Sequence, residues 1–287
     1  MRPATPTGGR RRKQLHAAVE GVRGQRPTAR ERQGDPELLA LVTEPYTGVE
    51  ETHERLRELL AAFEARADRR AVFLSIYSRM TGAVAERLRR GDFVDPDWVG
   101  EYLVAFANLY REAVRDYERG DLASLADPWQ LAFEANERGD SLVFQDAALG
   151  VNAHINYDLA LALADVGVGP DRARRYEDHS AITDVVGDLV QEAQDSLAAR
   201  DAPGLETLDE SLGSVDDRLW VFTVDECRDS AWRTAVALRS RFPPRRRLAR
   251  WINDVTSTGT AHLLTASRSS ERVHDALLGL EGPRDDR

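Results

Sequence analysis

His154 and Asp158 are the two residues of this sequence whose type and spacing most favour chemistry. They lie four residues apart within residues 142–166, LVFQDAALGVNAHINYDLALALADV, which are apolar on nearly every side. On an α-helix this spacing places an imidazole and a carboxylate on one face, one turn apart. The pair can therefore supply one nitrogen and one oxygen ligand to a divalent metal such as zinc.

A metal site needs further ligands, which other parts of the chain must supply. Asp178 and His179 are the best candidates, because their segment directly follows residues 142–166 and is expected to pack back beside them. Asp225 and Glu226, within a mostly apolar helix, come next. A metal-dependent hydrolase or a related enzyme is the function that such a site would suit. The predicted metal ligands are His154, Asp158, Asp178 and His179.

The same pair also has a structural interpretation. A buried neutral imidazole, bonded to Asp158 or to a main-chain carbonyl, would satisfy polar groups inside the core and fix the helix register. Gly150, one turn before His154, leaves a notch that could admit a partner helix or a small-molecule ligand. A pocket that reaches His154 favours the enzyme, whereas a sealed surround favours a non-catalytic binding or scaffold protein.

A helix that is apolar all round is expected in the middle of a domain. The other residues of this helix should divide between two faces. Leu161 and the polar Asp165 are expected on the side of His154. The opposite side, which should meet different neighbours, carries Gln145, Asn152 and Asn156.

Apolar residues recur at helical spacing from Gly48 onward, and no segment alternates apolar and polar residues over a convincing length. Asp95-Pro96 and Asp127-Pro128 each combine an N-cap with a proline at the first helical position. The last long helix runs through Leu248, Trp251, Ile252, Val255 and Leu263. The predicted helices span residues 49–66, 69–90, a segment from 96, 129–138, 142–166, 176–200, 205–212, 215–241 and 244–267. The expected fold is all-α, a single bundle of about eight helices around the buried helix 142–166.

Charge is unevenly spread along the chain. Residues 1–34 have a net charge of +7, so with a total of −10 the remainder carries −17. This basic arm is expected to be disordered, followed by a helical domain over residues 35–280 and a frayed tail over 281–287. The arm could bind nucleic acid or the acidic body, or have no role. The acidic body itself is expected to repel nucleic acid and anionic membranes.

The numbers of cysteine and lysine residues give information about the cellular compartment of the protein. Cys227 is the single cysteine, so an internal disulfide framework is excluded. The sequence has neither an apolar run that could span a bilayer nor a secretory signal, which favours the cytoplasm. Lys13 is the single lysine. An acidic surface almost without lysine is typical of a high-salt cytoplasm, or of a GC-rich genome.

The central motif LGVNAHINYDLALAL resembles an uncharacterised all-helical family, DUF5995. The same resemblance extends to FLSIYSRMTGA at residues 73–83, DPDW at 95–98, DPW at 127–129, YEDHSAITDVV at 176–186 and SAWR at 230–233. It covers roughly residues 56–238 and implies an all-helical fold with its polar core on the central helix. The resemblance implies no activity, because the family is itself of unknown function.

Overall fold

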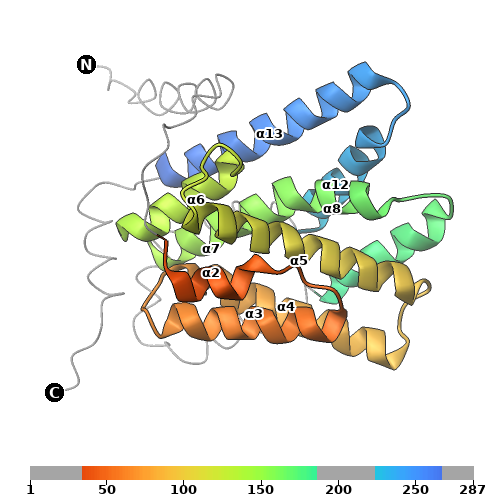
Figure 1. Cartoon of the computed structure of the whole chain (residues 1–287). Helices are drawn as coiled ribbons and strands as arrows, with labels where there is room; N and C mark the ends of the chain where they lie inside the picture. The colour runs from red at the N-terminus through yellow and green to blue at the C-terminus, as the bar shows by residue number, and fades with distance from the viewer. Residues whose placement is uncertain (1–33, 186–223, 267–287) are drawn as a thin grey trace, which may run out of the picture.

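The computed structural model describes residues 34–185 and 224–266, which form helices and loops with no strand among them. The predicted all-α bundle is therefore confirmed (Figure 1). The predicted arm (except Gly34), the predicted helix 205–212 and the predicted tail lie outside the described residues. None of the described helices combines the length and apolar character needed to cross a membrane.

The first half of the bundle is built from α2 (Pro36–Thr43), α3 (Val49–Glu64), α4 (Arg70–Arg90) and α5 (Pro96–Glu118). Helix α5 begins where the Asp-Pro signal predicts, and the Asp95 side chain accepts a hydrogen bond from the Trp98 N–H. Aromatic residues of α5 contribute to the core. The buried ones are Trp98, Tyr102, Phe106, Tyr110 and Tyr117.

The spacing of apolar residues does not predict helix α2, because it places the first helix after Gly48. Asp35 caps it, because its Oδ1 accepts hydrogen bonds from the N–H groups of Glu37 and Leu38 at 2.8 and 3.3 Å. Pro36 occupies the first helical position. This Asp-Pro start is the one seen at α5, so the signal was present, but eight residues are too few to establish a helical period.

The second half contains α6 (Asp127–Arg138), the central segment, a helical stretch over residues 172–185, α12 (Val224–Leu238) and α13 (Pro243–Ala266). Asp127 is the first residue of α6 rather than its N-cap, which is Ala126. The central segment consists of α7 (Val143–Val151), the π-helix η1 (Asn152–Asp158) and α8 (Leu159–Val166).

The π-helix is the main departure from the predicted central helix. In η1 the hydrogen bonds reach back five residues, as from the Leu159 N–H to the His154 carbonyl. One extra residue in a helix rotates everything that follows by about 100°. Leu161 and Asp165 consequently line a surface groove instead of sharing the surroundings of His154, which corrects the expectation for these two residues.

Helix α13 packs against the face of η1 that carries Asn152 and Asn156, and the two helices are joined by hydrogen bonds between side chains and main-chain carbonyls. Ser257 Oγ donates to the Asn156 carbonyl at 2.9 Å, and Asn253 Nδ2 donates to the Tyr157 carbonyl at 3.1 Å. In return, Asn152 Nδ2 donates to the Ser257 carbonyl at 2.9 Å. The face of the central segment that carries Asn152 and Asn156 thus meets α13, a different neighbour from that of His154, as predicted.

Candidate functional site

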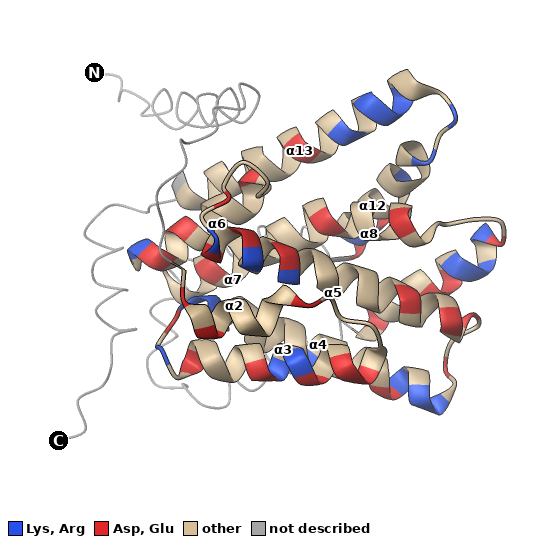
Figure 2. Ribbon diagram, viewed as in Figure 1, with Lys and Arg blue, Asp and Glu red and all other residues tan. Residues whose placement is uncertain are grey.

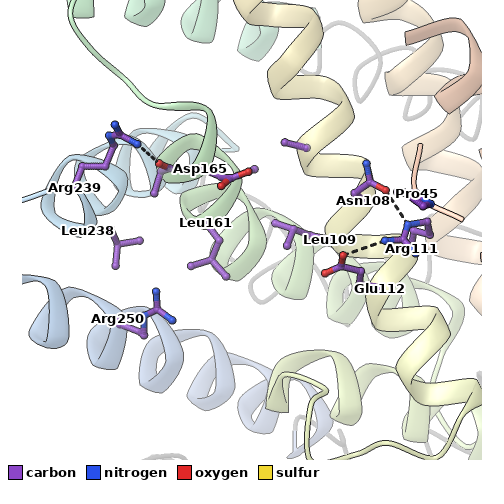
Figure 3. A pocket seen from close by; sticks show the side chains of 13 residues that line it. Pro45, Asn108, Leu109, Arg111, Glu112, Leu161, Asp165, Leu238, Arg239 and Arg250 are labelled. Atoms are coloured by element: carbon purple, nitrogen blue, oxygen red, sulfur yellow. Dashed lines mark hydrogen bonds and ion pairs between the residues drawn. The ribbon is translucent and has the colours of Figure 1, made fainter. Parts of the chain in front are cut away.

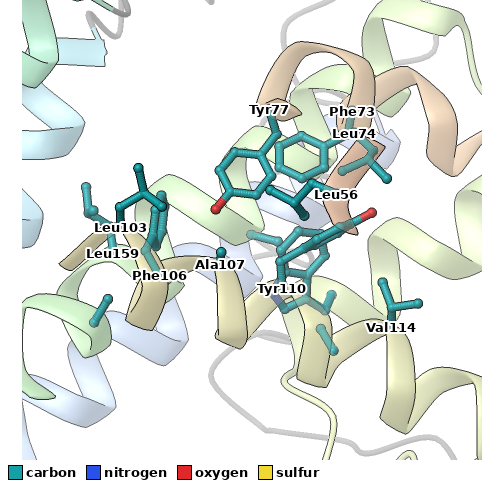
Figure 4. Close-up of a cluster of buried hydrophobic side chains, with 14 of the residues drawn as sticks. Leu56, Phe73, Leu74, Tyr77, Leu103, Phe106, Ala107, Tyr110, Val114 and Leu159 are labelled. Atoms are coloured by element: carbon teal, nitrogen blue, oxygen red, sulfur yellow. The ribbon is translucent and has the colours of Figure 1, made fainter. Parts of the chain in front are cut away.

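His154 is enclosed by aromatic rings. Its side chain is 1% exposed, and its ring stacks on Phe106 with centroids 3.6 Å apart and an interplanar angle of 9°. Tyr77 meets it edge to face at 4.4 Å. Phe73 and Tyr110 lie within 6.0 Å of it, and these rings gather in the core between α4 and α5 (Figure 4). The expectation that His154 is buried is therefore confirmed.

Of the two partners that the sequence leaves open for His154, Asp158 or a main-chain carbonyl, the structure has Asp158. His154 Nδ1 lies 3.0 Å from Asp158 Oδ2, and Trp129 Nε1 donates to the same oxygen at 2.8 Å. We refer to His154, Asp158 and Trp129 as the His154 cluster. Burial lowers the pKa of His154 well below its ordinary value and raises the pKa of Asp158 well above its own, against the lowering effect of the Trp129 N–H. Burial therefore favours the uncharged form of both groups.

The notch at Gly150 is filled by a neighbouring helix. A Cβ at this position would lie 2.4 Å from Phe73 Cγ, so glycine is what allows the α4 ring to approach the central segment. Of the two occupants that the sequence left open, a partner helix or a ligand, the structure has the helix.

Other buried polar residues of the central segment also have partners. Asp146 Oδ2 accepts from Arg69 Nε at 2.6 Å, and Gln145 Nε2 donates to the Leu264 carbonyl at 3.0 Å. His154 Nε2 is the exception in this segment, because it is buried and has no hydrogen-bond partner within the part of the chain described. Apart from that atom, the buried polar side-chain atoms of the central segment are satisfied by protein groups.

Asp178 and His179 serve two different neighbours. Asp178 accepts from the main-chain N–H groups of Val94 and Asp95 at 2.7 and 2.8 Å, just before α5 begins. His179 Nε2 lies 3.2 Å from the Arg228 carbonyl, so it must be the donor of that bond. The two adjacent side chains therefore tie residues 172–185 to the start of α5 and to α12.

Of the four predicted metal ligands, His154 and Asp158 are in contact, whereas Asp178 and His179 each bond to other groups. Across residues 34–185 and 224–266, no group of three or more His, Cys, Asp or Glu side chains is placed to hold a metal ion. The groups found around His154 come from α4, α5, α6 and the central segment, not from residues 176–184 as expected. Asp225 and Glu226, the next candidates for metal ligands, are exposed on α12.

Arg228 is a buried polar residue that sequence reasoning missed. It is 3% exposed, and its guanidinium donates to Thr183 Oγ1 at 2.7 Å and to the His179 carbonyl at 3.2 Å. Burial and this guanidinium together lower the pKa of His179 well below its ordinary value. A lone arginine in an amphipathic helix carries no sequence signal of burial, so this contact could not be foreseen.

A groove of about 830 Å³ opens between α5, α8, α12 and α13 (Figure 3). Half-buried leucines from three of these helices line it, namely Leu109, Leu161 and Leu238. Arg239, which directly follows α12, and Arg250 of α13 lie at one end of the groove, and Glu112 of α5 lies towards the other. His154 does not line this space.

The charged groups of the groove differ in how firmly they are held. Arg111 is buried, and its guanidinium donates to the Val42 carbonyl at 2.8 Å and to Glu112 at 3.0 Å. Arg239 is exposed and donates to the Ala164 carbonyl, the end of α8, at 2.7 Å. Arg250 is also exposed. Asp165 of α8 is exposed beside Arg239 (Figure 3), so two arginines and one carboxylate lie at this end of the groove. The excess positive charge makes it the end where an anionic group could be accommodated.

Comparison with known proteins gives one match. A model of a family of unknown function, DUF5995, matches residues 49–267. Neither the curated proteins nor the solved structures contain a significant match to this chain.

Proposed function

Since the chain belongs to the DUF5995 family of unknown function, we propose from its own residues that it is a non-catalytic helical protein that binds a small organic anion. The ligand occupies the groove between α5, α8, α12 and α13. The His154 cluster acts as a structural hub that holds the central segment in place and does not contact the ligand.

The proposal rests on where the polar groups face. His154 is 1% exposed and packed between rings, so a substrate has no route to its imidazole without repacking the core. The groove is open to solvent, and its volume lies in the range of small-molecule sites. Because η1 sets the rotation of α8, the hub also determines that Leu161 faces the groove.

The lining of the groove indicates the class of ligand. Arg239 directly follows α12 and Arg250 belongs to α13, and the two arginines can hold a carboxylate or another anion between them. The half-buried side chains of Leu109, Leu161 and Leu238 offer an apolar surface beside them. An anionic head with a short apolar body, such as a medium-chain carboxylate, matches this arrangement.

Calorimetric titration with octanoate and with octanol tests the proposal. Octanoate is expected to bind and octanol to bind at least about tenfold more weakly, because the alcohol lacks the charge that the arginines recognise. Arg250→Ala is expected to weaken octanoate binding by a similar factor. Leu161→Asp should weaken it further, because it removes apolar contact and places an additional carboxylate beside the apolar body of the ligand.

Arg247→Ala is the matched control, because Arg247 is an exposed arginine of the same helix and does not line the groove. It should bind octanoate like the unmodified chain. The proposal is wrong if octanoate does not bind, or if Arg247→Ala and Arg250→Ala weaken it equally.

A metal-dependent enzyme is the second candidate, and the unpaired Nε2 of His154 is the observation that favours it. Such a site would need Asp178 and His179 to leave the Val94 main chain and Arg228 and to move beside His154. Metal analysis of the purified chain after incubation with zinc or manganese separates the two candidates, since the first predicts no stoichiometric metal at His154.

A further inference from the structure

Helix α13 places its small and polar residues inward and its large apolar residues outward. The inward ridge repeats every four residues and consists of Ala249, Asn253, Ser257 and Ala261, all buried. The outward side chains of Leu248, Trp251 and Ile252 are 55%, 52% and 44% exposed. These are the residues that the sequence pattern would place in the core, so their exposure calls for a physical reason.

The inward face is polar because η1 requires it. Asn253 and Ser257 donate to main-chain carbonyls of the π-helix, and a large apolar side chain at either position would remove that hydrogen bond. The outward apolar residues are not explained in this way. Exposed apolar side chains that gather on one helix face are typical of a surface that another molecule covers.

The side of α13 opposite the inward ridge has the spacing of a helix-pairing seam. Leu248 and Ile252 are exposed on this side, and Val255, Gly259 and His262 are half-buried. These five residues are separated by four, three, four and three residues, which keeps them on one side of a helix that pairs with another. Among the residues that the structure describes, a Cβ at Gly259 would meet nothing within 4 Å, so packing against them does not require a glycine there. A glycine within a helix lowers stability, but it permits close approach of a second backbone.

We propose that this seam pairs with the same seam of a second copy, so that two α13 helices pack antiparallel across a two-fold axis near Val255. A two-fold axis places the same surface on both partners, which suits a single continuous stripe. The interface is a helix pair about 22 Å long, from residue 248 to residue 263. It is smaller than the interface of an obligate dimer, so the dimer is expected to dissociate on dilution.

The charges of α13 select the antiparallel arrangement. Arg245, Arg246, Arg247 and Arg250 all lie in its first turns, and no Asp, Glu, Lys or Arg follows Asp254 within the helix (Figure 2). In a parallel pair the two arginine groups would lie side by side and repel each other. In an antiparallel pair they lie at opposite ends, each beside the uncharged half of the partner helix.

Sedimentation equilibrium of the full chain over a range of concentrations tests the association. The chain is expected to show a monomer–dimer equilibrium, and Ile252→Glu is expected to weaken the dimer by about tenfold or more, since it buries a charge in the seam. Val94→Glu is the control, because Val94 is an exposed apolar residue outside α13. Circular dichroism confirms that each variant is folded.

Cysteine cross-linking tests the geometry in a Cys227→Ser background, which removes the single native cysteine. Val255→Cys lies near the axis and should form a disulfide with its own copy, because the two Cα atoms can come within about 7 Å. Leu248→Cys should not, because its two copies lie about 21 Å apart along the helices.

Several results would overturn the proposal. A chain that stays monomeric at all concentrations has no such interface, and a dimer insensitive to Ile252→Glu has another one. Cross-linking through Leu248→Cys indicates a parallel pair. A monomer that sediments with phosphatidylglycerol vesicles, and stops doing so in Trp251→Glu, indicates that the stripe binds an anionic membrane instead.

Discussion

Replacing Glu118 with alanine is expected to lower the free energy of unfolding by about 3–5 kcal/mol, the usual cost of removing one partner of a buried ion pair. Glu118 Oε1 lies 2.6 Å from Arg70 NH1, and the two residues are 1% and 5% exposed. Asp68 also binds this arginine, but its side chain is 20% exposed. Without Glu118 the arginine stays buried with its charge only partly balanced.

Urea unfolding of the variant measures this effect. Glu86→Ala is the control, because Glu86 forms an ion pair with Arg90 at 2.9 Å on the surface of α4, where such pairs contribute about 1 kcal/mol or less. Equal effects of the two substitutions would contradict the importance assigned to burial. Glu118 Oε2 also accepts the Asp35 N–H at 3.1 Å, so α2 should loosen in the same variant.

Replacing Asp158 with alanine is expected to destabilise the fold by about 1–3 kcal/mol for each group it leaves unpaired. Those groups are Trp129 Nε1 and His154 Nδ1, both buried. Asp158→Asn should be tolerated much better, because it keeps an oxygen acceptor and burial already favours the uncharged form of the carboxyl by raising its pKa. Equal losses in the two variants would show that the negative charge of Asp158 matters, as a metal site requires.

The sequence predicts those parts of the fold that depend on local rules. The Asp-Pro signal locates the start of α5, and the period of its aromatic residues identifies the buried face. The central segment is recognisable as core because it is apolar on nearly every side. Its division into a face that meets α13 and a face that meets the aromatic rings also follows from helical spacing.

The π-helix and its consequences could not be predicted in this way. One extra residue in η1 leaves no local sequence mark, yet it rotates α8 and moves Leu161 into the groove. The orientation of α13 follows from the same feature, because the carbonyls of η1 draw Asn253 and Ser257 inward. A pattern analysis that always places large apolar residues inside is therefore wrong for Trp251.

The predicted ligand set shows a similar limit. Asp178 and His179 are adjacent, but consecutive helical side chains point about 100° apart, so they reach different neighbours. Sequence proximity to the central segment could not reveal that Asp178 would bond to the main chain before α5. Nor could it reveal that Arg228 would lie against His179.

Nitrogen-15 NMR of the histidine rings, with and without zinc, tests most directly whether His154 is a sealed structural group. The His154 signals are identified by their loss in His154→Gln. Because burial lowers the pKa of this imidazole, its ring should remain neutral as the pH falls through the range in which an ordinary histidine takes up a proton. One equivalent of zinc should leave its signals unchanged. Protonation of His154 near its ordinary pKa, or a zinc-dependent shift of its ring nitrogens, would contradict the account and restore the metal-dependent enzyme.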